Sequence, residues 1–161
     1  DLGQPHPPGQ QRCYTFAAPG GEALHFCLHL PEGFGTSERK WPLLVFLHAL
    51  HNRLDGNNSL FRDSDAPTCL LLEADRCPRA LREDFVVLSP QCPPDEARED
   101  GSGVWLVKGY DEPVYDQELE AALAALIHNV ILAGHVDQDR IAVTGASMGG
   151  FACLELAARW P

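Results

Sequence analysis

Three short runs of apolar residues, separated by long connections, place the strongest constraint on how this chain folds. The runs are Leu43-Leu44-Val45-Phe46-Leu47, Phe85-Val86-Val87-Leu88 and Ile141-Ala142-Val143. Apolar runs without polar alternation are typical of strands that are buried on both faces of a sheet. Parallel strands need long crossover connections, usually helical, and the spacing of these runs provides them. We therefore predict a three-layer α/β fold, with a mostly parallel sheet between helices.

Two earlier segments, Arg12 to Ala17 and Ala23 to Leu30, alternate between apolar and polar residues and predict an antiparallel hairpin. The turn between them is Pro19-Gly20-Gly21. The second segment places one set of apolar side chains on a single face: Leu24, Phe26, Leu28 and Leu30. Residues 1–11 are rich in proline and glycine and predict an irregular lead-in, whereas residues 12–161 fit a single domain.

The clearest helix is predicted from Gln117 to Ala133, where apolar residues recur at helical spacing. Asp116 suits its N-cap and Gly134 suits the left-handed position after its last turn. A weaker helix from Ser64 to Leu81 is interrupted by two prolines, and Pro93 to Pro113 is expected to form a long loop.

The segment between the third apolar run and the helix that follows it carries the pattern Gly-x-Ser-x-Gly, in Gly145-Ala146-Ser147-Met148-Gly149-Gly150. This pattern is typical of a nucleophile elbow, a sharp turn from strand to helix that strains the serine backbone and needs small neighbours. Ser147 is therefore the candidate nucleophile, and the Met148 N–H is a candidate oxyanion donor at a helix N-terminus. The alternative is a glycine-rich turn that only joins a strand to a helix.

The segment after the first apolar run, His48-Ala49-Leu50-His51-Asn52, is the second candidate for the site. In an elbow-containing fold, backbone N–H groups of this loop complete the oxyanion hole. We assign that role to the backbone of Ala49 and Leu50. An ordinary strand-end loop with two histidines is the alternative.

Several other classes of site and partner do not fit the sequence. The Gly145 turn lacks the Lys-Ser/Thr of a phosphate loop and the spacing of a dinucleotide-binding loop. The formal net charge of -11 argues against nucleic acid and anionic membranes as partners, and no apolar run approaches the ~20 residues that span a bilayer. The six cysteines show no Cys-x-x-Cys spacing, so they do not indicate zinc and leave one or two disulfides open.

Three residues of the second hairpin strand, His25, Cys27 and His29, share one strand face. Such a set could bind a metal with a further ligand from elsewhere. We favour an outward polar face, because the opposite face is the apolar one, and we predict no metal site.

The order of five segments resembles the α/β-hydrolases described as predicted peptidases or esterases, relatives of polyhydroxybutyrate depolymerase-like and feruloyl-esterase-like enzymes. The segments are Pro31-Glu32-Gly33-Phe34, Trp41-Pro42 with the following run to His48, Ser89-Pro90-Gln91-Cys92-Pro93, Val136-Asp137-Gln138-Asp139-Arg140-Ile141, and Thr144 to Gly150. The resemblance extends from about Cys13 to the last residue.

The resemblance implies hydrolysis of a small-molecule carboxylic ester through an acyl-enzyme, without a metal or organic cofactor. Carried over by position, Ser147 is the nucleophile, and Met148, Ala49 and Leu50 form the oxyanion hole. His48 and Trp105 are assigned to the substrate pocket, Trp105 as a residue that lines the acyl group. A peptidase would share this nucleophile chemistry.

Two features depart from the family pattern. The family has His-Gly where this chain has His48-Ala49, and alanine would strain the oxyanion hole if that position needs a positive φ. In the family, an acid and a catalytic histidine follow the serine, whereas all seven histidines of this chain precede Ser147. His48 or His51 as a substitute base is the weaker alternative to truncation.

We therefore expect this chain to be the N-terminal part of an esterase domain, truncated after the nucleophile helix and nearly inactive alone. Its last strand would be an uncovered apolar edge that promotes pairing with another copy. The rival hypothesis is a non-catalytic binding or interaction module derived from an α/β-hydrolase.

Overall fold

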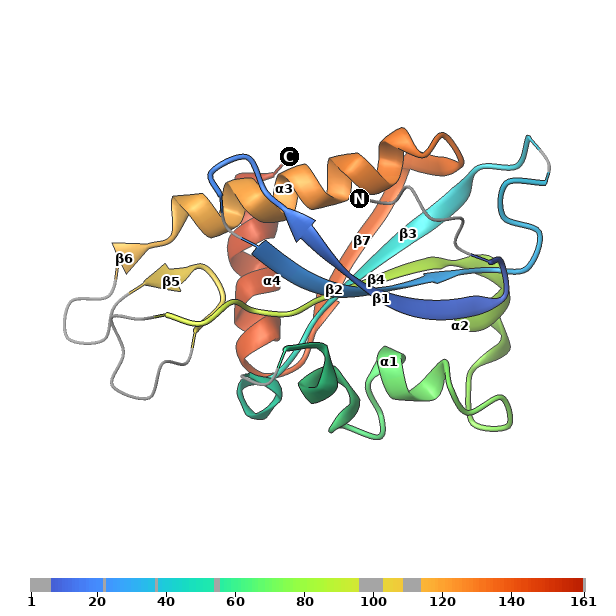
Figure 1. The fold of residues 1–161 in the computed structure, drawn as a ribbon, viewed down its shortest axis with the longest axis horizontal. Coiled ribbons are helices and arrows are strands. Elements are labelled where there is room, and N and C mark those ends of the chain that lie inside the picture. Colours follow the sequence, from blue (N-terminus) through green and yellow to red (C-terminus); the bar gives the residue numbers. More distant parts are fainter. Residues whose placement is uncertain are drawn as a thin grey trace.

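A five-stranded mixed sheet forms the centre of the molecule (Figure 1). The computed structural model describes residues 7–21, 23–36, 38–53, 56–95, 103–108 and 114–160. The strands of the sheet lie in the order β1-β2-β4-β3-β7. Their bounds are β1 Gln10–Ala17, β2 Ala23–Leu30, β3 Trp41–Leu47, β4 Val86–Pro90 and β7 Val136–Gly145.

The pairing within the sheet confirms the predicted α/β fold. β3 pairs in parallel with both β4 and β7, whereas β2 pairs antiparallel with β1 and β4. β1 and β2 are the predicted hairpin, although β1 begins two residues before the expected Arg12. The strand before Ser147 lies beside the strand before His48.

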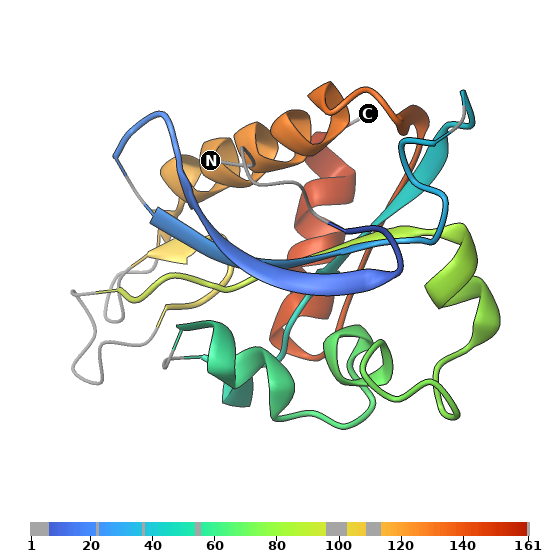
Figure 2. The ribbon, with the colours of Figure 1, turned by 45° about the vertical axis from the view of Figure 1, so that its right-hand side comes forward.

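Helices cover both faces of the sheet (Figures 1 and 2). On one side lie the two long helices, α3 and α4. On the other side lie the short helices that connect β3 to β4. The bounds are α3 Gln117–Leu132 and α4 Met148–Arg159, then η1 Leu50–Asn52, η2 Gly56–Phe61, α1 Pro67–Leu70 and α2 Arg79–Asp84.

The predicted helix is confirmed as α3, and its ends match the capping residues. An Oδ1 atom of Asp116 accepts a hydrogen bond from the Leu119 N–H at 3.0 Å, which satisfies a backbone donor of the first turn. Gly134 has a φ of 89° just beyond the last turn. One face of α3 is buried in the main core, together with the apolar face of β2. The core residues of these two faces are Leu24, Phe26, Leu28, Leu30, Leu119, Ala122, Leu123, Leu126, Ile127 and Val130.

The third apolar run does not form the doubly buried strand that we predicted. It lies in β7, which is an edge strand of the sheet, and Ile141 keeps 37% of its surface exposed. β7 has a partner on one side only, because β3 is its sole neighbour within the described sheet. Of the three residues in the run, only Val143 is partly buried and packs against the core.

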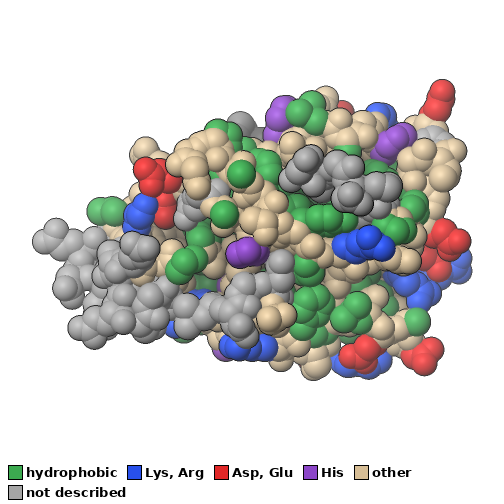
Figure 3. All heavy atoms as spheres, viewed as in Figure 1, with side chains coloured by type: hydrophobic (Ala, Val, Ile, Leu, Met, Phe, Trp, Pro, Cys, Tyr) green, Lys and Arg blue, Asp and Glu red, His purple; other side chains and the backbone are tan. Residues whose placement is uncertain are grey.

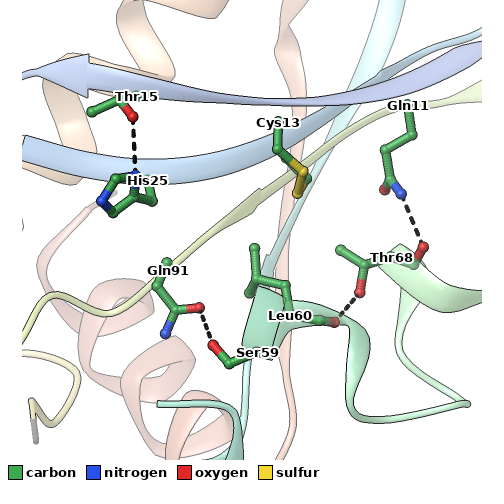
Figure 4. Close-up of a disulfide and its surroundings, with 9 residues drawn as sticks. Gln11, Cys13, Thr15, His25, Ser59, Leu60, Thr68 and Gln91 are labelled. Carbon is green, nitrogen blue, oxygen red and sulfur yellow. Dashed lines mark hydrogen bonds between the residues drawn. A yellow bond between two sulfur atoms is a disulfide. The ribbon is translucent and has the colours of Figure 1, made fainter. Parts of the chain in front are cut away.

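The polar face of β2 is also more buried than predicted. Cys27 and His29 are 0% and 1% exposed, and only His25 of the three faces solvent. Cys27 forms a disulfide with Cys13, which lies directly opposite in the hairpin (Figure 4). Gln11 on β1 donates to the Thr68 carbonyl of α1, so the short helices cover this face. No cluster of metal-binding side chains occurs among the described residues.

The prolines divide the predicted helix of residues 64–81 into two short ones. α1 begins at Pro67, where the missing N–H costs nothing, and α2 begins directly after Pro78. The expected loop of residues 93–113 contains β5 (Val107–Lys108), which pairs with β6 (Val114–Tyr115). Residues 96–102 and 109–113 of that loop lie outside the described residues.

Charged side chains of both signs stand next to one another on the face shown in Figure 3. Arg39 pairs with Asp84, and Arg79 pairs with Glu83, so part of the acidic excess is locally balanced. These pairs are exposed and contribute little to stability. In the described part of the chain, no helix is both long and apolar enough to span a membrane.

Candidate active site

Three neighbouring strands bring the predicted site segments to one edge of the sheet. β4, β3 and β7 are adjacent and parallel, so their carboxyl ends lie side by side. Gln91 follows β4, His48 follows β3, and Ala146 follows β7. In open α/β sheets, ligands bind outside the carboxyl ends of the strands. The fold therefore assembles a candidate site from segments that are far apart in the sequence.

Ser147 has the backbone conformation that the elbow pattern predicts. Its φ of 49° and ψ of -112° are those of the first central residue of a type II′ turn, a position that normally requires glycine. The Gly149 N–H closes this turn on the Ala146 carbonyl at 2.9 Å. The Ser147 side chain is exposed and does not cap the helix that it precedes. Its hydroxyl group is therefore presented to solvent and free for chemistry.

Close backbone contacts hold the elbow against the end of β3. The Ala146 N–H donates to the Leu47 carbonyl at 3.1 Å. A Cβ atom on Gly149 would lie 1.9 Å from the Leu47 oxygen, and one on Gly145 would lie 2.6 Å from the Gly149 oxygen. Only glycine permits these approaches, which explains the spacing of the pattern in physical terms.

The three predicted oxyanion donors lie on the two segments that meet here. Met148 is the first residue of α4, where backbone N–H groups lack helical partners and the helix dipole favours negative charge. Ala49 and Leu50 follow β3 after one intervening residue, His48, and their N–H groups find no acceptor within the described residues. The role of these N–H groups remains a prediction.

Alanine at position 49, where the family has glycine, does not strain the backbone of the candidate oxyanion loop. Its φ is -77° and its ψ is 170°, an extended conformation that any residue adopts. The side chain is buried, at 4% exposed. The change from glycine to alanine is therefore compatible with the loop conformation in this chain.

His48 lies inside the molecule rather than at an open surface. It is 1% exposed, and its Nδ1 atom lies 2.8 Å from the Ala49 carbonyl oxygen. Its Nε2 atom accepts a hydrogen bond from the Cys92 N–H at 2.9 Å and lies 3.1 Å from Nε2 of Gln91. Burial is the main cause that lowers the pKa of His48 to about 4, so the ring is neutral at pH 7. This placement does not favour the predicted pocket role or a role as base.

Gln91 belongs to a buried polar network that the sequence analysis did not identify. Its Nε2 donates to the Asn52 carbonyl at 2.8 Å. Its Oε1 accepts from the Ser59 hydroxyl at 2.9 Å, as Figure 4 shows. Asn52 donates in turn to the Ser59 carbonyl at 2.9 Å. All three residues are at most 3% exposed. In the sequence, only the position of Gln91 just after a predicted buried strand pointed to a buried polar role for this residue.

Trp105 is buried against the same loop. Its Nε1 donates to the His48 carbonyl at 3.0 Å, and the centres of the two rings are 5.0 Å apart. Trp105 also lines a pocket of about 470 Å³ that runs along α4. The pocket is lined by Val104, Trp105, Leu106, Val107, Val114, Tyr115, Met148, Phe151, Ala152, Glu155 and Arg159. A pocket role for Trp105 is thus compatible with its placement and remains a prediction.

The described histidines do not include a partner for Ser147. His25 lies 3.0 Å from the Thr15 hydroxyl, and His51 lies 3.9 Å from Asp63. Within the described part of the chain, no hydrogen bond joins a histidine to Ser147. The site thus contains a strained serine and candidate anion donors, with no adjacent base among these residues.

No family model and no curated protein sequence matches the chain. Among solved structures, it is similar to a thermostable esterase, at 25% identity and a TM-score of 0.68, over 88% of this chain and 36% of that one. It is also similar to a ferulic acid esterase, at 18% identity and a TM-score of 0.60, over 94% of this chain and 54% of that one. A third neighbour is an S-formylglutathione hydrolase from Agrobacterium tumefaciens, at 18% identity and a TM-score of 0.60, over 99% of this chain and 57% of that one.

These neighbours confirm the resemblance to α/β-hydrolases of esterase type. The chain has their fold, and it spans 36% to 57% of their length.

Proposed function

We propose that this chain carries the nucleophile and the oxyanion hole of a serine hydrolase that cleaves carboxylic esters through an acyl-enzyme at Ser147. The observation that carries the proposal is the Ser147 backbone, which adopts a glycine-like conformation at the N-terminus of α4 with its hydroxyl group unused. Strain of this kind costs about 1–3 kcal/mol and clusters at functional sites. Similarity to a thermostable esterase supports the choice of ester hydrolysis.

In the proposed reaction, the Ser147 oxygen attacks the ester carbonyl carbon and transfers its proton to a base. The carbonyl oxygen becomes an oxyanion, which accepts hydrogen bonds from the N–H groups of Met148, Ala49 and Leu50. Collapse of this intermediate breaks the bond to the alcohol, which leaves with the proton. Water then hydrolyses the acyl-enzyme and restores the serine.

The base and its orienting acid are proposed to lie outside these 161 residues. The placement of His48 argues against it as the base, because its Nε2 atom already accepts the Cys92 N–H in the interior. A serine without a base is a weak nucleophile, so residues 1–161 alone are expected to hydrolyse esters very slowly.

The test uses the natural gene product and a fluorophosphonate probe together with p-nitrophenyl acetate. We expect the probe to label Ser147, and the Ser147→Ala variant to lose both labelling and at least about 10³-fold in kcat. Ser64→Ala, a change at another exposed serine, should leave both unchanged. A folded natural product that neither labels nor hydrolyses the ester would contradict the proposal and favour the binding module.

A further inference from the structure

The two peptide groups that carry the Ala49 and Leu50 N–H groups are each held through their carbonyl oxygen by a buried side chain. Trp105 donates to the His48 carbonyl at 3.0 Å, and the His48 ring donates to the Ala49 carbonyl at 2.8 Å. We infer that Trp105 and His48 are positioning residues, which orient these two N–H groups toward the oxyanion of the proposed reaction. The inference rests on the proposed function.

The planarity of the peptide bond makes each carbonyl contact an orienting contact. In a trans peptide, the C=O and the following N–H lie in one plane and point in opposite directions. A side chain that fixes the His48 carbonyl therefore fixes the direction of the Ala49 N–H. In the same way, the contacts on the Ala49 carbonyl, from the His48 ring and from the Asn52 N–H at 3.1 Å, fix the direction of the Leu50 N–H. Both N–H groups stay without an acceptor in the described part of the chain.

The hydrogen bonds at Nε2 of the His48 ring determine which ring nitrogen carries the proton. The Cys92 N–H can only donate, so Nε2 of His48 must be the acceptor. A neutral ring then carries its proton on Nδ1, and this N–H points at the Ala49 oxygen. Gln91 holds the same ring from the β4 side and is itself fixed by Asn52 and Ser59.

The loop after β3, which carries these two carbonyls, also lies against the elbow. The His48 oxygen, which Trp105 holds, would be 2.9 Å from a Cβ atom on Gly149, in the first turn of α4. Trp105 and Met148 both line the pocket along α4. A shift of the Trp105 ring would therefore be transmitted to the loop donors and to the wall of that pocket.

Each of two substitutions removes one of the two side-chain contacts on these carbonyls, which we call clamps, and keeps most of the buried volume. Trp105→Phe removes the indole N–H. His48→Gln places an amide where the Nε2 acceptor was and loses the Nδ1 donor, whereas His48→Asn keeps a donor near Nδ1. In the natural gene product, we expect Trp105→Phe and His48→Gln to lower kcat about tenfold or more with KM within about twofold, because the donors act mainly on the transition state. His48→Asn should retain more of kcat than His48→Gln.

A trifluoromethyl ketone, whose serine adduct carries an oxyanion, supplies a readout that a general loss of structure would not produce. Its affinity should fall by the same factor as kcat/KM in each variant. Trp160→Phe and His29→Gln are matched controls. Trp160 donates its indole N–H to Glu120, and His29 is a buried histidine near the start of β4. Both controls should keep kcat within about twofold of the unsubstituted protein.

Folded Trp105→Phe and His48→Gln variants with unchanged kcat would overturn the inference and leave the proposed function intact. The same would follow if the two controls lost as much activity as the clamp variants. If His48→Gln does not fold, the kcat of Trp105→Phe alone tests the inference. A natural product without Ser147-dependent hydrolysis would instead contradict the proposed function, and the inference with it.

Discussion

At the scale of single residues, the site depends on backbone conformation more than on side-chain partners. Ser147 adopts a positive φ that L-residues avoid, and no side-chain contact of its own compensates for it. The hydrogen bonds of the turn and the packing of Gly149 against Leu47 impose this conformation. The strain is thus compensated by the neighbouring structure and can be measured by changing the residue that bears it.

Replacing Ser147 by glycine should stabilise the protein relative to replacing it by alanine. Both variants lack the hydroxyl group, but only glycine adopts a φ of 49° without strain, so we expect Ser147→Gly to be more stable by about 1 kcal/mol. Urea unfolding of the two variants measures the difference. Ala157, on the exposed face of α4, is the control, because Ala157→Gly should be destabilising by about 1 kcal/mol. Equal stability of the two Ser147 variants would argue against a strained elbow.

The buried His48 ring should make stability depend on pH. Its pKa is lowered to about 4 in the folded state, first by burial, against 6.5 for an exposed histidine. Below pH 6.5 the unfolded chain binds a proton that the folded protein does not, so stability falls as the pH falls from 6.5 to 4. The loss attributable to this group is roughly 3 kcal/mol.

Urea unfolding at pH 7.5, 5.5 and 4 measures this dependence. The glutamine in His48→Gln cannot titrate. The free energy of unfolding of this variant should therefore fall less between pH 6.5 and 4 than that of the unsubstituted protein, by roughly the same 3 kcal/mol. The comparison with the unsubstituted protein removes the contribution of the carboxyl groups. An identical pH dependence in both proteins would show that His48 is not a buried neutral ring.

At the scale of elements, the junction of β7 and α4 is set by how closely two backbones approach. Gly149 in the first turn of α4 lies against the Leu47 and His48 carbonyls at the end of β3. Gly150, one residue later, has its nearest neighbour at 3.5 Å from an added Cβ atom. Adjacent glycines of the same helix therefore have different structural requirements.

Alanine substitutions at Gly149 and Gly150 should have effects of opposite sign. A Cβ atom on residue 149 would lie 1.9 Å from a backbone oxygen, so Gly149→Ala must displace α4 from β3 and should cost several kcal/mol, about 3 or more. Gly150→Ala meets only ordinary contacts and gains helix propensity, which stabilises by about 0.5–1 kcal/mol. Chemical denaturation of both variants is the measurement. Similar stabilities would show that α4 does not dock on β3 in this way.

At the scale of the whole molecule, the described structure has an edge strand with one neighbour and several exposed apolar side chains. β7 has no second neighbour in the described sheet, and residues 141–145, which pair in continuous register with β3, carry no charge or proline. The charged residues of β7, Asp137, Asp139 and Arg140, precede this part. On the neighbouring helix α4, Phe151 and Leu154 are 73% and 70% exposed. Free edges without charges or prolines pair readily with strands of other chains. Self-association through this edge therefore remains our proposal for residues 1–161.

Residues 1–161 should form dimers or larger species as their concentration increases, through pairing of β7 with β7. Sedimentation velocity at increasing concentration measures this. A lysine on the edge should oppose pairing, so Ala142→Lys is expected to shift the protein toward the monomer. Ala124→Lys, on the exposed face of α3, adds the same charge elsewhere and should have little effect. Monomeric behaviour at all concentrations would exclude association through the β7 edge.

The sequence by itself determined the local structure and the position of the elbow. Apolar alternation defined the hairpin, helical spacing with Asp116 and Gly134 defined α3, and the pattern around Ser147 predicted a strained turn. These features depend on residues close together in the chain, so a short window contains their physical causes. The resemblance to esterase-type α/β-hydrolases was confirmed as well, because several such windows occur in the family order.

Only the tertiary structure decided how much of each strand is buried, which polar groups are buried, and what holds the loop after β3. The apolar pattern of the Ile141 run predicted burial, yet burial depends on which strands lie beside it, and the described sheet places one strand, β3, beside β7. His48 was assigned to a pocket, but Gln91, Cys92 and Trp105 surround it from segments 43 to 57 residues away. Contacts between distant segments are set by the packing of the sheet, which no single stretch of sequence encodes.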